Sequence, residues 1–238
     1  MTDIHCHILP GLDDGAQDLS DTVQMARIAA DCGITHIVAT PHCNIPGEVN
    51  NYIGHAYVDA LQSAREAISE AHIPVKLLSG MEVFVTFDLP DLIRADKILT
   101  LNHSNYMLIE FDFGEDPDFV DFMTDRLLEM KLVPVIAHPE RYEFIKYDIE
   151  FALRLRRKGC LFQANKDSFL GKYGQGAEKT AFALLRRNLI TAVASDAHSP
   201  HHRTPDNRRA IHTLSGDFDV RKLFSDTPKK ITSNEYVR

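Results

Sequence analysis

The sequence lacks a long hydrophobic stretch and has no excess of basic residues. No segment approaches the roughly 18 consecutive apolar residues that a membrane-spanning helix needs. Met1-Thr2-Asp3 leads directly into a strand-like run, without the charged and apolar regions of a signal segment. The formal net charge of -8 disfavours non-specific binding to nucleic acid or to an anionic membrane surface. We therefore expect a cytoplasmic protein with no membrane insertion and no nucleic-acid partner.

Cysteine is scarce, and its spacing argues against two kinds of chemistry. The four cysteines form no CxxC pair, which is typical of reduced thiols in a cytosolic protein: Cys6, Cys32, Cys43 and Cys160. A structural zinc site would more often show thiolates at fixed spacing. A cysteine-based phosphatase needs an arginine six residues after its nucleophile, and no cysteine here has one. Thiolate ligands and a thiolate nucleophile are therefore both disfavoured.

The chain also lacks repeats, low-complexity tracts and Pro/Gly-rich linkers that would divide it. Its 238 residues and 44% hydrophobic content suffice for a substantial core, so we expect one domain over residues 1–238. Seven strand-like runs alternate with mostly helical segments, at about 2–8, 34–40, 75–83, 106–111, 133–138, 160–165 and 190–196. This alternation predicts an α/β fold with a parallel sheet. In a closed parallel barrel, the C-terminal strand ends form one rim where functional groups collect.

Two other segments carry weaker signals. A helix is expected to begin near Pro117, and its apolar stripe should lie in the core: Phe119, Phe122, Met123, Leu127 and Met130. Gly171, Gly174 and Gly176 flank Lys172 and Tyr173, but their spacing fits no phosphate-binding fingerprint. We interpret this glycine-rich segment as a flexible loop.

The two ends of the chain carry a pattern typical of a metal site. His5 and His7 are separated by one residue in a strand, so their side chains point to the same face. Asp196-Ala197-His198 repeats this spacing far along the chain. Imidazoles and carboxylates also occur where four other strand-like runs stop: His42, Glu82, Glu110 and His138. Imidazole together with carboxylate suits Mn, Fe or Zn, so we predict a metal site built from these eight side chains.

A ninth ligand is expected from the turn-rich segment after the first strand. Asp14 can return over the rim, and Asp13 is an alternative that spacing alone does not separate from it. Nine ligands exceed what one or two ions would use, so we expect three divalent ions. Their charge of +6 is offset by -4 from Asp14, Glu82, Glu110 and Asp196, and the remaining +2 would match a phosphate dianion. Seven histidines do not follow a strand-like run in this way: His36, His55, His72, His103, His201, His202 and His212. Of these, His201 and His202 are candidates for the rim of the site.

Two arginines are candidates for holding a phosphoryl group. Arg141 lies three residues beyond His138, and a guanidinium fork there could make bidentate contacts with phosphate oxygens. The alternative for Arg141 is a surface ion pair with Glu140 or Glu143. Arg203 lies five residues beyond His198 in a Pro-flanked loop and is the second candidate.

These motifs together resemble a known bacterial family. The segments DIHCHILPGLDDGA, ATPH, GMEV, IEF, AHPERY, QANKDSFLG and SDAH are similar to those of the PHP-domain protein-tyrosine phosphatases of capsule and exopolysaccharide operons, the CpsB/CapC type. The resemblance runs from residue 3 to about residue 205. It implies a distorted (β/α)7 TIM-like barrel of the PHP type with three divalent ions, most often Mn.

The resemblance also implies a role for each site residue. His5, His7 and Asp196 would bind a first ion, and Glu82 would bridge it to a second ion held by Glu110 and His138. A third ion would be held by Asp14, His42 and His198. His42 would also be required for turnover. Arg141 and Arg203 would grip the phosphoryl group.

The implied activity is metal-dependent hydrolysis of phosphotyrosine on a protein. The expected protein partner is the tyrosine autokinase that such operons encode, and a homo-oligomer is compatible with the sequence. One alternative is hydrolysis of a small phosphomonoester such as histidinol phosphate. Two further alternatives are a PHP module that binds partners without turnover and a nuclease of the same superfamily.

Overall fold

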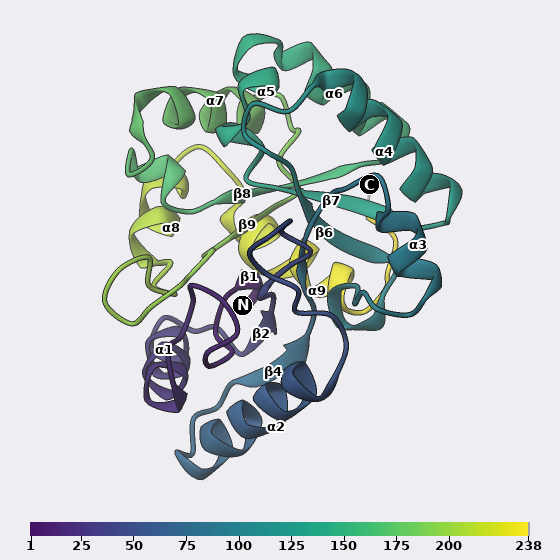
Figure 1. Cartoon of the computed structure of the whole chain (residues 1–238). Coiled ribbons are helices and arrows are strands. Elements are labelled where there is room, and N and C mark those ends of the chain that lie inside the picture. The colour runs from purple at the N-terminus through teal and green to yellow at the C-terminus, as the bar shows by residue number, and fades with distance from the viewer. Residues whose placement is uncertain (238) are drawn as a thin grey trace.

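The computed structural model describes residues 1–237, and its strands form a parallel barrel (Figure 1). Every hydrogen-bonded strand pair is parallel. The strands are β1 Thr2–Cys6, β2 His36–Ala39, β3 His42–Cys43, β4 Lys76–Ser79, β5 Glu82–Phe84, β6 Tyr106–Glu110, β7 Val133–Ala137, β8 Leu161–Asn165 and β9 Ala192–Ala194.

These nine strands occupy seven positions around the barrel. β2 and β3 are separated only by Thr40 and Pro41, and β4 and β5 only by Gly80 and Met81, so each pair is one interrupted strand. Pro41 has no N–H to donate to a neighbouring strand, which explains the first interruption. The order is therefore β1-β2-β4 on one side and β3-β5-β6-β7-β8-β9 on the other. The seven strand-like runs expected from the sequence are all present.

The barrel closes where the two ends of the chain meet. The backbone N–H of Asp196 donates to the carbonyl of His5 at 2.8 Å, and the N–H of His7 donates to the carbonyl of Ala197 at 2.8 Å. These bonds join the segment after β9 to β1. Closure therefore places Asp196 next to His5, although the two lie at opposite ends of the chain.

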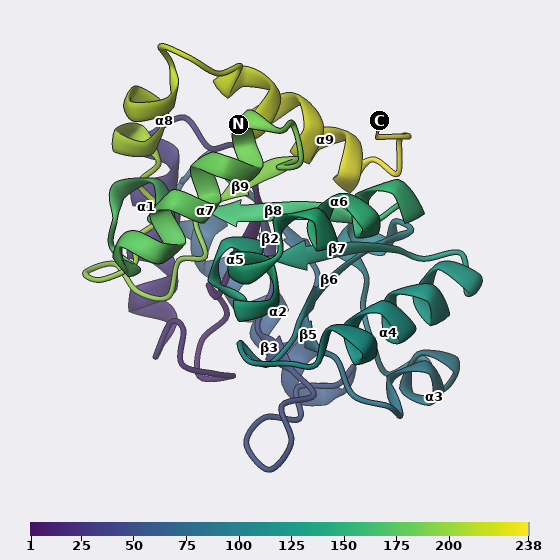
Figure 2. The same ribbon diagram turned by 90° about the horizontal axis from the view of Figure 1, so that it is seen from above.

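Helices cover the outside of the barrel (Figures 1 and 2). Figure 1 shows α1 and α2 beside the early strands and α4 to α7 beside β6, β7 and β8. No helix within residues 1–237 is long and apolar enough to cross a membrane. The helices are α1 Leu19–Asp31, α2 His55–Glu70, α3 Leu89–Arg94, α4 Pro117–Glu129, α5 Glu143–Tyr147, α6 Ile149–Lys158, α7 Gly174–Arg186, α8 Arg208–Leu214 and α9 Thr227–Thr232.

Helix α4 confirms the start expected at Pro117 but not the whole of its buried face. The Asp116 carboxylate caps the helix by accepting from the Asp118 N–H at 2.9 Å. Met123 and Leu127 are buried as expected, whereas Phe122 is 45% exposed. The prediction for Phe122 was wrong because helical periodicity gives the direction of a stripe but not its width. The Phe122 ring lies at the edge of that stripe, 6.4 Å from the ring of Phe87.

The barrel interior changes character along its axis. Alternating residues of the central strands form an apolar cluster towards their N-terminal ends, which Ile231 of α9 joins: Tyr106, Leu108, Val135, Leu161, Ala192 and Ala194. On β6, the residue that continues this series at the C-terminal end is Glu110; on β8, the continuing residues are Gln163 and Asn165. The apolar half therefore closes one end of the barrel, and polar side chains occupy the other.

Candidate metal centre

The nine predicted ligands meet at the polar end of the barrel. Five of them lie in the segments that follow β1, β7 and β9: His7, Asp14, His138, Asp196 and His198. The other four lie in strands: His5 in β1, His42 in β3, Glu82 in β5 and Glu110 in β6. His42 and Glu82 begin short strands instead of ending long ones, because the second and third strand positions are interrupted just before them.

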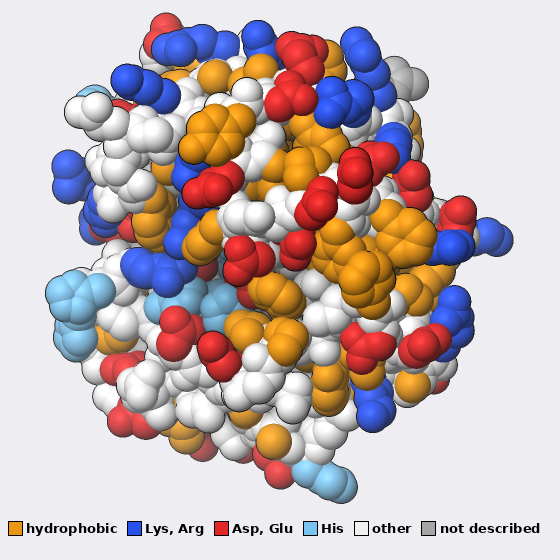
Figure 3. Space-filling view, turned by 45° about the horizontal axis from the view of Figure 1, so that its top comes forward, with side chains coloured by type: hydrophobic (Ala, Val, Ile, Leu, Met, Phe, Trp, Pro, Cys, Tyr) orange, Lys and Arg blue, Asp and Glu red, His pale blue; other side chains and the backbone are white. Residues whose placement is uncertain are grey.

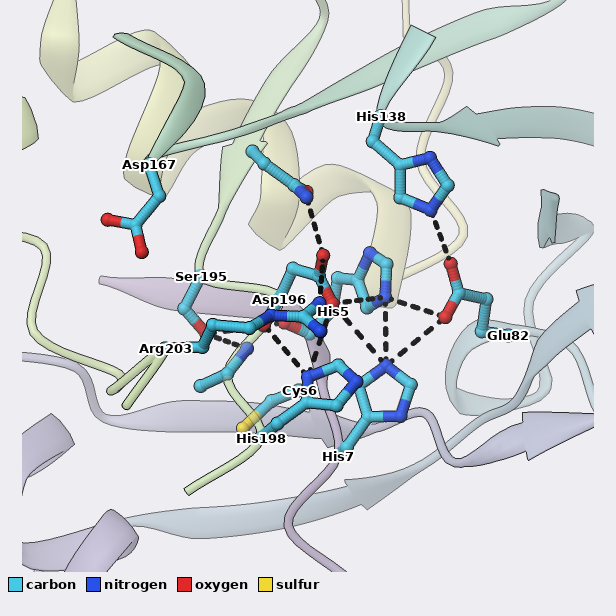
Figure 4. Close-up of polar contacts among 12 residues, drawn as sticks. His5, Cys6, His7, Glu82, His138, Asp167, Ser195, Asp196, His198 and Arg203 are labelled. Carbon is cyan, nitrogen blue, oxygen red and sulfur yellow. Dashed lines mark hydrogen bonds and ion pairs between the residues drawn. The ribbon is translucent and has the colours of Figure 1, made fainter. Parts of the chain in front are cut away.

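Four donor atoms converge at the centre of this rim (Figure 4). The Nε2 atoms of His5 and His7 lie 3.2 Å apart. Oε2 of Glu82 lies 3.0 Å from Nε2 of His5 and 3.1 Å from Nε2 of His7. Oδ1 of Asp196 lies 3.3 Å and 3.5 Å from the same two nitrogens. Ligand atoms about 2.1 Å from one ion are separated by roughly 3.0–3.4 Å, so this spacing fits a single cation.

A second group shares Glu82 with the first. Nδ1 of His42 lies 3.2 Å from Oε2 of Glu82 and 2.9 Å from Oε1 of Glu110. Nε2 of His138 lies 3.0 Å from Oε1 of Glu82 and 3.8 Å from Oε2 of Glu110. The two oxygens of Glu82 therefore face different partners, which is the arrangement that a bridging carboxylate requires.

A third group contains Asp14, which separates it from its neighbour Asp13. Oδ1 of Asp14 lies 3.4 Å from Nε2 of His198 and 3.6 Å from Nε2 of His42. The Asp13 carboxylate instead accepts from the backbone N–H of His42 at 2.8 Å and from Nδ1 of His7 at 2.7 Å. Because those bonds occupy Asp13, Asp14 is the aspartate that reaches the cluster. His42 faces both the second and the third group, one nitrogen to each.

Three of the imidazoles are oriented by a hydrogen bond on their other nitrogen. Nδ1 of His5 donates to Oε1 of Gln163 at 2.7 Å, and Nδ1 of His198 donates to the backbone carbonyl of Asp196 at 3.0 Å. The Asp13 bond does the same for His7. A proton on Nδ1 leaves Nε2 with a free lone pair directed at the cluster, as in known histidine metal sites.

Sequence reasoning missed the residues that support the ligands. Gln163 and Asn165 are two apart on β8, so they face the interior together, and the Asn165 amide donates to Oδ2 of Asp196. Asp3 accepts from the backbone N–H groups of His5 at 3.3 Å and Ser195 at 3.1 Å. The alternation of polar residues in QANKD was the signal that could have identified Gln163 and Asn165.

The electrostatics of the rim fit bound cations. Among the buried atoms that form no hydrogen bond within residues 1–237 are His42 Nδ1, Glu82 Oε2, Glu110 Oε1 and His198 Nε2. Several of these atoms lie within about 3 Å of one another, but their geometry does not satisfy that of a hydrogen bond. Burial raises the pKa of Glu82, but the attraction of His5 and His42 outweighs burial and holds it well below its usual range. Buried carboxylates that stay ionised need positive charge beside them, which divalent ions would supply.

The ion-free protein compensates these carboxylates with protons on imidazoles. Burial lowers the pKa of His42, but the nearby carboxylates of Glu82 and Glu110 outweigh burial and raise this pKa to about 9. The pKa of His7 also lies well above its usual range, because Asp13 outweighs the effect of burial. Protons and metal ions therefore compete for the same nitrogens.

A pocket of about 270 Å³ opens onto the cluster. Its polar wall includes Arg141 and Arg203, and its apolar wall consists of Ile45, Phe84, Phe111 and Phe113. Figure 3 shows the histidines at the bottom of this hollow, with basic side chains beside them. The pocket thus joins a candidate metal cluster, two guanidinium groups and an aromatic surface.

The two arginines are held in different ways. The Cζ atom of Arg141 lies 4.3 Å from the ring centre of Phe113 and 4.7 Å from that of Tyr173. The Glu140 carboxylate instead accepts from the backbone N–H of Asn165 at 2.9 Å and from the Ser168 hydroxyl at 2.6 Å, and Arg141 forms no ion pair with Glu140 or Glu143 within residues 1–237. Nη2 of Arg203 lies 2.6 Å from Oδ2 of Asp196.

Three residues at the cluster have a strained backbone. His138, Asp196 and Arg203 have φ values of 35°, 48° and 49°, in the left-handed region that residues other than glycine seldom adopt. Such conformations cost about 1–3 kcal/mol each and persist only where the surrounding structure enforces them. The fold therefore stabilises these three side chains in positions that the local backbone disfavours.

The remaining histidines lie outside all three groups of donor atoms. All seven are exposed. His201 and His202 do lie near the rim, in a separate pocket with Lys172, Tyr173 and Arg203. The glycine-rich segment around Tyr173 is only partly a loop, because α7 begins at Gly174.

The cysteines lack the features of a nucleophile. Cys6, Cys43 and Cys160 are buried. Burial raises the pKa of the Cys43 thiol to about 12, so it stays protonated at neutral pH. These facts agree with the spacing argument against thiolate chemistry.

Comparison with known proteins agrees with the geometry of the site. The family model described as "Capsular polysaccharide synthesis, CpsB/CapC" matches residues 1–233. The chain is 35% identical over 234 residues to the tyrosine-protein phosphatase YwqE of Bacillus subtilis, covering 98% of this chain and 89% of YwqE. It is 32% identical over 230 residues to the putative tyrosine-protein phosphatase CapC of Staphylococcus aureus, covering 97% of this chain and 84% of CapC.

A solved structure extends the similarity to three dimensions. Its description names YwqE from Bacillus subtilis and CpsB from Streptococcus pneumoniae as unique metal-dependent tyrosine phosphatases. The TM-score is 0.93 at 32% identity, covering 100% of this chain and 96% of that one. This likeness confirms the distorted α/β barrel that the sequence predicted. The chain belongs to the CpsB/CapC family.

Proposed function

We propose that this chain is a metal-dependent protein-tyrosine phosphatase. The observation that carries the proposal is one pocket in which His, Asp and Glu donor atoms face two arginines and a wall of aromatic rings. Relatives named as tyrosine phosphatases support it over nearly the whole chain. An arrangement of this kind suits an anionic group attached to an aromatic ring.

We propose three divalent ions, with Mn the first choice and Fe or Zn as alternatives. The first would be held by His5, His7, Glu82 and Asp196, the second by Glu82, Glu110, His138 and His42, and the third by Asp14, His42 and His198. Bound divalent ions supply positive charge at the phosphoryl oxygens and lower the pKa of water, which provides the nucleophile. The charge count with four carboxylates leaves +2, which a phosphate dianion would neutralise.

The chain's own residues would bind and orient the substrate. Arg141 and Arg203 line the pocket beside the donor cluster and would bind phosphoryl oxygens with planar N–H groups. Phe84, Phe111 and Phe113 also line the pocket and would contact the tyrosine ring. A phenolate leaving group has a pKa near 10, so it departs with little help from a general acid.

We propose that the substrate is the phosphorylated tyrosine autokinase of a polysaccharide operon, encountered in the cytoplasm. The family description, capsular polysaccharide synthesis, supports this partner. Histidinol phosphate is the second candidate substrate, since it would use the same metals and arginines. The aromatic wall and the names of the relatives favour phosphotyrosine.

Turnover with and without metal tests the proposal. Purified protein is assayed on a phosphotyrosine peptide, histidinol phosphate and labelled DNA, each with added Mn or with a chelator. We expect hydrolysis of the peptide with Mn, loss of activity with the chelator and recovery when Mn is restored. Full activity of metal-free protein, or a strong preference for histidinol phosphate, would overturn it.

A matched pair of variants localises the activity to the cluster. His42→Ala removes a side chain that faces two of the three donor groups and is expected to lose most of the turnover. His55→Ala is the control, because His55 is exposed at the start of α2. Equal activities of the two variants would contradict the proposed site.

A further inference from the structure

One hydroxyl group beside the pocket has no assigned role. Tyr173 directly precedes α7, and its hydroxyl oxygen is buried without a hydrogen-bond partner in residues 1–237. Nε of Arg203 is buried and unpartnered in the same way. A buried donor without an acceptor costs about 1–3 kcal/mol. Two such donors near one another indicate that an acceptor from outside the chain belongs between them.

The surroundings of the Tyr173 hydroxyl define what that acceptor would be. The charged groups that act on it are Asp196, Arg203, Arg141 and Asp167. Asp167 is already engaged by Lys166 at 2.9 Å and Lys172 at 3.0 Å. Asp196 is likewise engaged by Arg203 at 2.6 Å, so each of the two aspartates has a cationic partner. The Arg141 guanidinium over the Tyr173 ring then favours an anionic oxygen at the hydroxyl.

The position of the ring is fixed by its neighbours. The Arg141 guanidinium lies between the rings of Tyr173 and Phe113, with Cζ 4.7 Å and 4.3 Å from their centres. Tyr173 also shares the wall of the adjoining pocket with Arg203. Burial raises the pKa of Tyr173 to about 12, so the hydroxyl keeps its proton and can donate.

We propose that the Tyr173 hydroxyl donates a hydrogen bond to an oxygen of the phosphoryl group that Arg141 and Arg203 bind. The proposal rests on the proposed function, because it requires a phosphoryl group in this pocket. It makes Tyr173 a third phosphate-binding residue, contributed by a segment whose sequence indicated only a loop. Its ring would also keep the Arg141 guanidinium in place.

The first experiment removes only the hydroxyl. Tyr173→Phe keeps the ring against Arg141, and Tyr147→Phe is the control because Tyr147 is 87% exposed. We expect Tyr173→Phe to lower kcat/KM by about 10- to 100-fold on both a phosphotyrosine peptide and p-nitrophenyl phosphate, since loss of one preorganised donor has effects of this order or larger. Metal content and melting temperature should match the wild type.

The second experiment measures phosphate directly. Inhibition by inorganic phosphate, and its binding to Mn-loaded protein by calorimetry, should weaken by about tenfold in Tyr173→Phe and not in Tyr147→Phe. Unchanged phosphate affinity would mean that the hydroxyl serves only an ordered water, which overturns the proposal. A large loss in Tyr173→Leu with none in Tyr173→Phe would assign the ring alone and would also overturn it.

The two proposals fail in different ways. If wild-type protein hydrolyses phosphotyrosine and Tyr173→Phe matches it within twofold, the inference about Tyr173 is wrong and the proposed function stands. If wild-type protein hydrolyses no phosphomonoester with Mn, the proposed function is wrong. The phosphate-binding comparison then decides on Tyr173 by itself.

Discussion

Replacing Gly15 with alanine should disrupt the candidate metal centre without replacing any of its nine predicted ligands. Gly15 follows Asp13 and Asp14, and its backbone passes directly over His7. A Cβ atom at Gly15 would lie 2.2 Å from the carbonyl oxygen of His7 and 2.5 Å from the His7 Cβ. Ordinary contacts of a Cβ are longer by about 1 Å or more, so either the loop or His7 must move.

The cost of this movement can be worked out from the contacts of His7. Its carbonyl accepts from Ala16 at 3.0 Å, and its N–H donates to Ala197 at 2.8 Å, so the backbone is fixed on both sides. Overpacking of this kind costs about 1–3 kcal/mol. For a chain of this length, each kcal/mol lowers Tm by about 2–4 °C, which gives a loss of roughly 2–12 °C. A displacement of about 1 Å at a reacting centre can lower turnover about 100-fold.

Thermal melting, bound metal and turnover together test this prediction. Gly176→Ala is the control, because Gly176 lies in α7 and an added Cβ there meets no atom within 4 Å. Alanine in a helix is favoured over glycine by up to about 1 kcal/mol, so this variant should melt at or above the wild-type temperature. A Gly15→Ala protein with wild-type metal content and turnover would refute the close approach that the reasoning assumes.

Three further predictions concern the same rim. Asp13→Asn should lower metal affinity by about 10- to 100-fold, measured by calorimetry with Mn, because an amide accepts poorly from both His7 and the His42 backbone. The difference in Tm between Mn-loaded and chelated protein should widen between pH 7 and pH 9.5. In the ion-free protein the pKa of His42 is about 9, against about 6.5 in the unfolded chain. The resulting stabilisation is complete below pH 6.5 and is lost as the pH rises through 9. Metal binding strengthens over the same range, because protons leave the nitrogens that would bind the ions. Cys43→Ala should keep turnover within a few-fold, since its thiol stays protonated.

Each of these has its own control or contrary outcome. Asp59→Asn changes an exposed carboxylate on α2 and should bind Mn as the wild type does. A Tm difference that stays constant across the pH range would show that protons and metal ions do not compete at His42. Loss of turnover in Cys43→Ala, with melting and metal content intact, would favour thiol chemistry after all.

Local sequence pattern was sufficient for the strand positions and for the residues whose donor atoms converge at the rim. A strand directs alternate side chains to one face, so the spacing of His5 and His7 predicted their shared direction. Asp196 and His198 have the same spacing but follow β9, so their direction depends on the turn there. Parallel strands direct their C-terminal ends to one rim, which brought Glu110 and His138 into the same prediction. These predictions need only the sequence of each segment and not its neighbours in the fold.

Other features depended on neighbours that no local pattern specifies. The width of the buried stripe on α4 is one such feature, because Phe122 is exposed and its ring lies 6.4 Å from that of Phe87, which precedes α3. Gln163 matters because barrel closure brings β8 against His5. Tyr173 became a candidate for the site only because the folded chain places the Arg141 guanidinium over its ring.

The sequence by itself determined the alternation of strands and helices and the polar residues at the strand ends. Only the tertiary structure decided between Asp13 and Asp14, because that choice depends on which carboxylate the His7 ring and the His42 backbone have already engaged. It also decided that His42 faces two donor groups and that Arg141 is held between aromatic rings. Spacing fixes the direction of a side chain on its own strand, whereas its partners across the barrel are fixed only when the chain closes.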